Sequence, residues 1–127
     1  MLWILPIALF AQSTTGADDD PWSEFASADD FVAYINTSTA RVLPDGTLGV
    51  WIEFRRTKPE KNGTVRQLAL NGFNCQNVTV TTQAITWYDS AGKVTFSHTY
   101  ASYERTAEAI PPGSIIEAAY QIVCNKR

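Results

Sequence analysis

The segment from Leu48 to Arg55 constrains the fold of this chain more than any other stretch, because its side chains alternate in character at every step. The apolar members are Leu48, Val50, Ile52 and Phe54, and the residues between them are Gly49, Trp51 and Glu53. Successive side chains of a strand point to opposite faces of a sheet, so the pattern predicts a strand with one buried face. Pro44-Asp45-Gly46 just before it is typical of a tight turn, which places a partner strand at about Thr39 to Leu43.

Further strands follow from the same reasoning. A second hairpin is predicted from Trp87-Tyr88 to Val94-Phe96, around the turn residues Asp89-Ser90-Ala91-Gly92. The apolar parity changes from even at Val78 and Val80 to odd at Ile85 and Trp87, which predicts a β-bulge between Thr81 and Ala84. Shorter candidate strands are Trp22 to Phe25, Phe31 to Ile35 and Val65 to Leu70.

The C-terminal stretch has a helical pattern instead. Pro111-Pro112-Gly113 prevents an earlier start, Ser114 is placed as the N-cap, and Glu117 is placed to complete a capping box. An apolar stripe at steps of three and four follows, formed by Ile115, Ala118, Ala119, Ile122 and Val123. The expected fold is therefore α+β: a single antiparallel sheet of about six strands, packed by one C-terminal helix of about ten residues.

Composition limits the class of protein. The 127 residues are 45% hydrophobic and 12% aromatic, which is enough for one domain with one core. A net charge of -3 and a pI near 5.0 give no general attraction to nucleic acid or to an anionic membrane surface. No run of 18 apolar residues is present, so no membrane span is predicted.

Residues 1–17 resemble a signal peptide. An apolar run from Leu2 to Ala11 is followed by Thr15 and Ala17, which are small enough for a signal peptidase site. The usual basic residues before the run are missing, and a buried N-terminal strand or helix is the alternative. On the first interpretation, residues 18–127 are the mature domain.

The chain has two cysteines, Cys75 and Cys124. In an exported protein they are expected to pair, because an oxidising compartment favours disulfides. Two buried free thiols are the alternative. A redox or metal site has less support, since the cysteines are 49 positions apart and His98 is the only histidine.

Several segments, in this order, resemble the surface-adhesin protein E family. They are Trp22, Phe31 to Asn36 with Thr37-Ser38, Asp45-Gly46 before Val50-Trp51, the Leu68 strand to Cys75, Tyr88-Asp89 before Gly92, and Ile110 to Ser114 ending at Val123-Cys124. The likeness spans nearly all of residues 18–127. It departs at Asn36, where members often have aspartate, and at Thr106-Ala107, where a tryptophan is expected.

The resemblance implies an antiparallel sheet packed by one C-terminal helix, with Cys75 and Cys124 bridged. It also implies export to a bacterial periplasm or cell surface, or secretion, with host matrix or other proteins as partners and the capacity to form a homodimer. A shared fold does not determine what a given member binds.

Catalysis has little support in the sequence, so we expect a protein that is not an enzyme and uses no cofactor or metal. His98 shares its strand face with Val94, Phe96 and Tyr100 and has no evident acid partner, which favours a packed histidine over a general base. The sequence contains neither a G-x-S-x-G nor an H-E-x-x-H motif.

Two surface features are candidate partner-binding sites. Five basic residues fall within twelve positions and flank Pro59 and Asn62-Gly63: Arg55, Arg56, Lys58, Lys61 and Arg66. They predict either a contact for an acidic partner or an ordinary solvated hairpin. Trp51 lies on the strand face opposite Val50 and Ile52, where it is either half exposed or covered by a loop or by the Trp22 segment.

These observations favour an exported bacterial binding module of the adhesin type. The alternative is a periplasmic protein inhibitor or envelope-maintenance factor that inserts a projecting loop into its target. A hydrolase ranks third.

Overall fold

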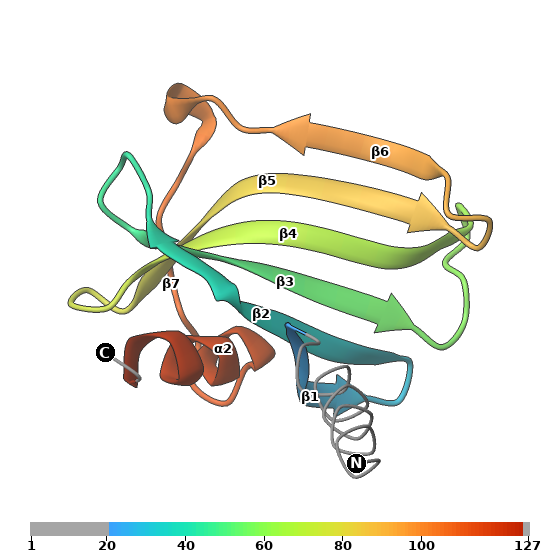
Figure 1. The fold of residues 1–127 in the computed structure, drawn as a ribbon, viewed down its shortest axis with the longest axis horizontal. Helices are drawn as coiled ribbons and strands as arrows, with labels where there is room; N and C mark the ends of the chain where they lie inside the picture. The colour runs from blue at the N-terminus through green and yellow to red at the C-terminus, as the bar shows by residue number, and fades with distance from the viewer. Residues whose placement is uncertain (1–20, 126–127) are drawn as a thin grey trace, which may run out of the picture.

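The computed structural model describes residues 21–125. The chain folds into a curved antiparallel sheet, and a helix packs against one end of it (Figure 1). The strands are β1 Trp22–Ala28, β2 Phe31–Val42, β3 Leu48–Arg56, β4 Thr64–Asn74, β5 Thr79–Asp89, β6 Val94–Thr99 and the two-residue β7 Glu108–Ala109. A 3-10 turn, Ser102–Glu104, follows β6, and the helix α2 spans Ile115–Asn125. β1 to β6 pair in chain order, and β7 pairs with the start of β5. The predicted α+β fold class is confirmed.

The hydrophobic core lies between α2 and the sheet. Side chains from β2, β3 and β4 meet Ala119 and Val123 of the helix, and the central members are Ile35, Val50, Ile52 and Phe73. Their alternation along β3 is the period-two pattern that predicted this strand. The residues of opposite parity point away from the helix, on what we call the outer face.

β2 joins two segments that the sequence presented as separate strands, Phe31 to Ile35 and Thr39 to Leu43. Between them the register shifts: Asn36 pairs with Trp51 and Arg41 pairs with Gly49, so residues 37–40 stand opposite Val50 alone. The side chain of Asn36 holds this irregularity, since its Oδ1 accepts hydrogen bonds from Ser38 N at 3.2 Å and Ser38 Oγ at 2.6 Å. Local side-chain bonds thus replace the regular ladder.

The predicted β-bulge in β5 is confirmed. Leu70 pairs with Ala84 and Asn71 pairs with Thr82, which leaves Gln83 as the extra residue. Its side chain is buried, and Nε2 donates a hydrogen bond of 2.9 Å to Asp45 Oδ2 in the β2–β3 turn. The bulge thereby ties β5 to a turn 38 positions earlier in the chain.

The β2–β3 hairpin depends on two glycines for different reasons. Gly46 has a φ of +87°, which favours glycine in this turn. Gly49 is required by space, because a Cβ there would lie 2.5 Å from Leu43 Cδ1 and 2.6 Å from Leu43 Cγ.

The helix begins as predicted and is fastened at its other end. Ser114 Oγ accepts a hydrogen bond from Glu117 N, while Glu117 Oε1 accepts one from Gly113 N instead of from the N-cap residue itself. Cys124 in the last turn forms a disulfide with Cys75 beyond the end of β4, with 5.7 Å between the Cα atoms. Tyr120 also donates a 2.9 Å hydrogen bond to the Cys75 carbonyl.

Among residues 21–125, no helix has the length and apolar character needed to cross a membrane. The predicted signal peptide, residues 1–17, lies outside the described residues.

Candidate functional site

The outer face of the sheet brings together two of the predicted basic residues with aromatic side chains. In the strand register, Tyr34 stands opposite Glu53, and Arg55 stands opposite Arg66. Arg66 in turn pairs with Tyr88 of β5. Four adjacent strands therefore contribute to one cluster, which we call the arginine–tyrosine cluster: Tyr34, Glu53, Arg55, Arg66 and Tyr88.

Glu53 is the anchor of this cluster. Its side chain is only 5% exposed, and burying a carboxylate is costly unless it is paired. Arg55 Nη2 lies 3.0 Å from Glu53 Oε1, and Arg66 Nε lies 2.6 Å from Oε2. One buried carboxylate thus holds two guanidinium groups, leaving a net charge of +1.

Each of these guanidinium groups also lies over a tyrosine ring. Arg55 is 3.9 Å from the centroid of Tyr34, and Arg66 is 4.1 Å from that of Tyr88. The arginine side chains nevertheless remain 48% and 43% exposed. The cluster therefore presents two oriented guanidinium groups to the solvent.

The other three basic residues lie elsewhere. Arg56 points to the opposite face of β3, where its guanidinium forms ion pairs with Asp30 at 2.9 Å and Glu60 at 3.2 Å. Lys58 and Lys61 are exposed in the β3–β4 loop. Neither lysine takes part in an ion pair in the described part of the chain. The sequence placed all five in one projecting loop, whereas the structure divides them among two sheet faces and the loop.

Trp51 lies on the outer face, next to the arginine–tyrosine cluster. It pairs with Asn36 on one side and Leu70 on the other, and it is half-buried. The Trp22 segment forms strand β1 and extends the sheet beside β2. Tyr, Trp and Arg are the residue types enriched at protein–protein hot spots, so Trp51 and the cluster form one candidate binding surface.

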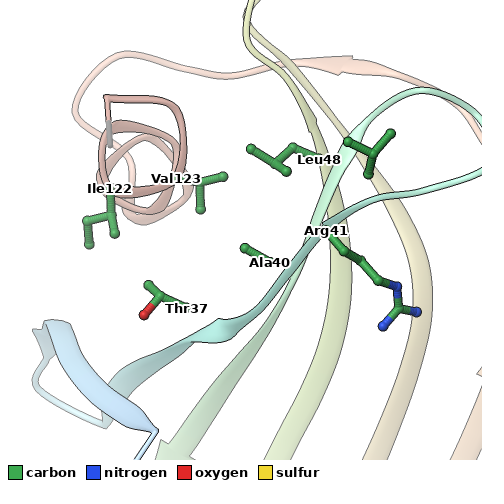
Figure 2. Close-up of a pocket in the computed structure, with 7 residues that line it drawn as sticks. Thr37, Ala40, Arg41, Leu48, Ile122 and Val123 are labelled. Atoms are coloured by element: carbon green, nitrogen blue, oxygen red, sulfur yellow. The ribbon is translucent and has the colours of Figure 1, made fainter. Parts of the chain in front are cut away.

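A cavity of about 380 Å³ opens between α2 and β2 (Figure 2). We call it the helix–sheet cavity, and its lining residues are Thr37, Ala40, Arg41, Val42, Leu48, Ile122 and Val123. Side chains of Leu48 and Val123 point toward one another across it, while Arg41 extends away from it. No local sequence pattern indicates this cavity, because it lies beside the register shift in β2.

A polar network at the β2–β3 turn was also missed. Asp45 Oδ1 accepts hydrogen bonds from Thr47 Oγ1 at 2.6 Å and Thr47 N at 3.0 Å, and Oδ2 accepts one from Gln83. Burial raises the pKa of Asp45, but these hydrogen bonds and the charge of Arg105 outweigh it and hold that pKa below its ordinary value. The network is structural, since it links the turn to the β5 bulge.

His98 does have an acidic neighbour, contrary to the sequence interpretation. Its side chain is 40% exposed, and Nε2 lies 3.4 Å from Glu104 Oε1 in the 3-10 turn. The ring also meets Tyr100 edge to face at 4.5 Å. Over the described range 21–125, no group of three or more His, Cys, Asp or Glu side chains could hold a metal ion.

Comparison with known proteins agrees with this architecture. The family model described as surface-adhesin protein E matches residues 22–125, which is nearly the whole described chain. The chain belongs to the surface-adhesin protein E family. Membership supports a surface adhesin-type binding protein, and it confirms the resemblance seen in the sequence.

Two solved structures are similar to this member of the family. A structure of Haemophilus influenzae protein E in crystal form II is 13% identical, with a TM-score of 0.58 over 84% of this chain and 89% of that one. A further structure of Haemophilus influenzae protein E is 15% identical, with a TM-score of 0.57 over 84% and 86% of the two chains. At this level of identity the likeness shows the fold alone. No curated protein matches the sequence.

Proposed function

We propose that this protein is an exported binding module that contacts acidic segments of partner proteins, host matrix components among them, through the arginine–tyrosine cluster. Family membership supports the general class of adhesin-type binding. The cluster supports the specific chemistry, because arginine recognises carboxylates through several oriented N–H groups.

The observation that carries the proposal is the anchoring of both arginines by Glu53. A flexible surface arginine loses side-chain entropy when it binds a ligand. Arg55 and Arg66 have already lost much of it, because each is fixed by the same carboxylate and by a tyrosine ring. Their partly exposed guanidinium groups are therefore preorganised for an anionic partner, and Trp51 beside them adds apolar contact area.

Lys58 and Lys61 extend the positive surface at the loop that joins β3 and β4. Both are exposed, so we assign them a steering role that raises the rate of encounter more than the affinity. Arg56 is excluded from the binding surface, because its guanidinium is engaged by Asp30 and Glu60.

The test uses an immobilised oligoglutamate peptide as the probe and the full mature chain as the analyte. Arg55→Ala with Arg66→Ala should raise Kd at least tenfold, about 1.4 kcal/mol, because the two oriented donors are lost. Arg41→Ala is the matched control, since it removes an exposed arginine that lies opposite Gly49, six residues along β3 from Arg55. Equal effects of the two changes, or no binding by the wild-type protein, would contradict the proposal.

Export is the second part of the proposal, with cleavage after Ala17 and exposure at the cell surface. Amino-terminal sequencing of protein from its native host should find Asp18 first. Protease added to intact cells should degrade the protein. Protection until the outer membrane is permeabilised would favour the periplasmic inhibitor or envelope-maintenance factor instead.

A further inference from the structure

The chain between β6 and α2 runs beside the first residues of β5, which β6 does not reach. The last pair of the β5–β6 ladder is Ala84 with Thr99. Beyond it, Tyr100 N donates a hydrogen bond of 2.9 Å to Gln83 O, and β7 then pairs with the start of β5. Residues 100–109 are therefore tied to β5 at both ends, at the end of the sheet where β5 begins (Figure 1).

A small polar hollow lies between this segment and β5, and we call it the Arg105 hollow. Its volume is about 220 Å³. Every residue that lines it has a polar side chain: Thr82, Tyr100, Glu104, Arg105, Thr106 and Glu108. No aliphatic side chain contributes to the lining, so the hollow suits a ligand that carries hydrogen-bonding groups around its whole outline.

Arg105 supplies oriented donors to the hollow. The residue is half-buried, and its Nε donates a hydrogen bond of 3.0 Å to Tyr100 O, which fixes the plane of the guanidinium. Within residues 21–125 its terminal amino groups form no hydrogen bond or ion pair. These groups therefore remain available to donate to a ligand in a defined direction.

Two glutamates supply acceptors to the same hollow. Glu104 is held in place, because its Oε1 accepts a hydrogen bond of 2.7 Å from Ala101 N and lies 3.4 Å from His98 Nε2. Glu108 is exposed and takes part in no ion pair in the described part of the chain. Carboxylate oxygens accept several hydrogen bonds, so both side chains can accept from a ligand.

Charge in the hollow disfavours ionic ligands of either sign. Two carboxylates and one guanidinium leave a net charge of -1, which opposes an anion, while a cation would meet Arg105. A neutral ligand that both donates and accepts hydrogen bonds avoids both conflicts. Sugar hydroxyls do both, and the ring of Tyr100 provides an aromatic wall for the C–H face of a sugar.

We propose that the Arg105 hollow binds a single neutral sugar ring. Its volume lies below the range of about 300–1,000 Å³ that is typical of small-molecule pockets, which limits the ligand to one ring. The hollow lies beside the start of β5, whereas Tyr88 of the arginine–tyrosine cluster lies near the other end of that strand. The proposal is therefore independent of the proposed function, and the two sites can be tested separately.

The experiment titrates the mature protein with D-glucose, D-galactose, D-mannose and N-acetyl-D-glucosamine by saturation-transfer NMR. At least one of them should bind with a millimolar Kd, as expected for a ligand of one ring. D-Glucuronate and D-glucosamine, which carry one negative and one positive charge, should bind at least about threefold more weakly than that sugar. Failure of all the neutral sugars to bind overturns the site. Tighter binding of either charged sugar overturns the neutral preference.

Two substitutions locate the site. Arg105→Lys keeps the charge but loses the fixed fork of donors, so Kd should rise about fivefold. Glu108→Ala removes an exposed acceptor and should raise Kd about threefold, and it tests the site by itself if the lysine variant does not fold. Arg41→Ala and Glu24→Ala are the matched controls, since both remove exposed charged side chains outside the hollow, and they should leave Kd unchanged. Sugar binding that neither Arg105→Lys nor Glu108→Ala weakens overturns the assignment to this hollow.

Methyl glycosides distinguish the two sources of such a ring. Binding of the methyl glycoside as tightly as the free sugar assigns the hollow to the terminal ring of a glycan. Binding of the free sugar alone assigns it to a monosaccharide. In both cases Arg105→Lys should weaken the binding, and binding that is insensitive to it in a folded variant contradicts the proposal.

Discussion

At the scale of single residues, Gly49 shows how one missing side chain allows the hairpin to close. A methyl group at this position would collide with the branched end of Leu43, which is almost fully buried. Gly49→Ala should therefore lower the free energy of unfolding by about 1–3 kcal/mol, measured by urea denaturation. In a Leu43→Ala background the same change should cost clearly less, because the colliding atoms are gone. Equal costs in both backgrounds would show that the close approach is not the cause.

Asp45 makes stability depend on pH at the same hairpin. Its pKa is lowered in the folded protein, so the carboxylate stabilises the fold above its unfolded pKa of about 3.9. This contribution is lost as the pH falls below about 4 and through the folded pKa. Urea unfolding measured from about pH 2 to pH 6 should therefore show that the free energy of unfolding falls less steeply with acid in Asp45→Asn than in the wild-type protein.

Thr47→Val provides the comparison for this effect. It removes a hydroxyl donor to Asp45 and leaves the carboxylate in place, so the pKa of Asp45 rises toward its ordinary value. The free energy of unfolding of Thr47→Val should therefore also fall less steeply with acid than that of the wild-type protein. An unchanged profile in both variants would mean that another group governs acid stability.

At the scale of elements, the disulfide matters most for α2. The helix has only 11 residues, which is too short for stability by itself in water, and the bridge ties its last turn to the sheet. Replacing both cysteines by serine should cost about 2–5 kcal/mol, and the chain-entropy estimate for a loop of this length is about 4 kcal/mol. Denaturation with and without reductant measures the cost.

The serine variant is its own control in that experiment. Reductant should lower the free energy of unfolding of the wild-type protein to that of the double serine variant. It should leave the free energy of unfolding of the variant unchanged. If reductant frees both thiols and the stability of the wild-type protein does not change, the disulfide contributes nothing to stability.

The sequence was sufficient to predict elements whose pattern is local. The alternation along β3, the parity change at Gln83 and the cap at Ser114 each lie within a few residues, and the structure confirms all three. The sequence did not predict that the two segments of β2 form one strand, because residues 37–40 show no apolar alternation. Their hydrogen bonds depend instead on Asn36 and on the distant Trp51. The helix–sheet cavity was missed for the same reason.

The candidate site was predictable only in part. Arg55, Arg66 and Trp51 were singled out by residue type, but their grouping depends on strand register, which no local pattern reveals. The alternation along β3 predicted that Glu53 lies on the polar face of the strand. It did not indicate that Arg55 and Arg66 would cover the Glu53 carboxylate. Glu104 likewise reaches His98 only because the chain after β6 turns back.

At the scale of the whole molecule, the distribution of charge decides how binding responds to salt. The overall charge is -3, so attraction to an acidic partner must come from the local surface around Arg55, Arg66, Lys58 and Lys61. Screening shortens from about 10 Å at 0.1 M salt to about 3 Å at 1 M. Affinity for the oligoglutamate probe should fall steadily over that range, as measured by surface plasmon resonance.

Lys58→Gln with Lys61→Gln separates steering from contact in the same measurement. The association rate should fall and lose much of its dependence on salt, while the dissociation rate stays nearly constant. A change confined to the dissociation rate would place the lysines in the contact surface itself.

The bridge between Cys75 and Cys124 has a consequence for the durability of the protein. It closes β5, β6 and α2 into one covalent ring, in which the connecting loops are the segments most open to proteases. A single cut in any of these loops opens the ring but releases no fragment. The nicked chain keeps all its strands attached, so a lone cleavage does not dismantle the module.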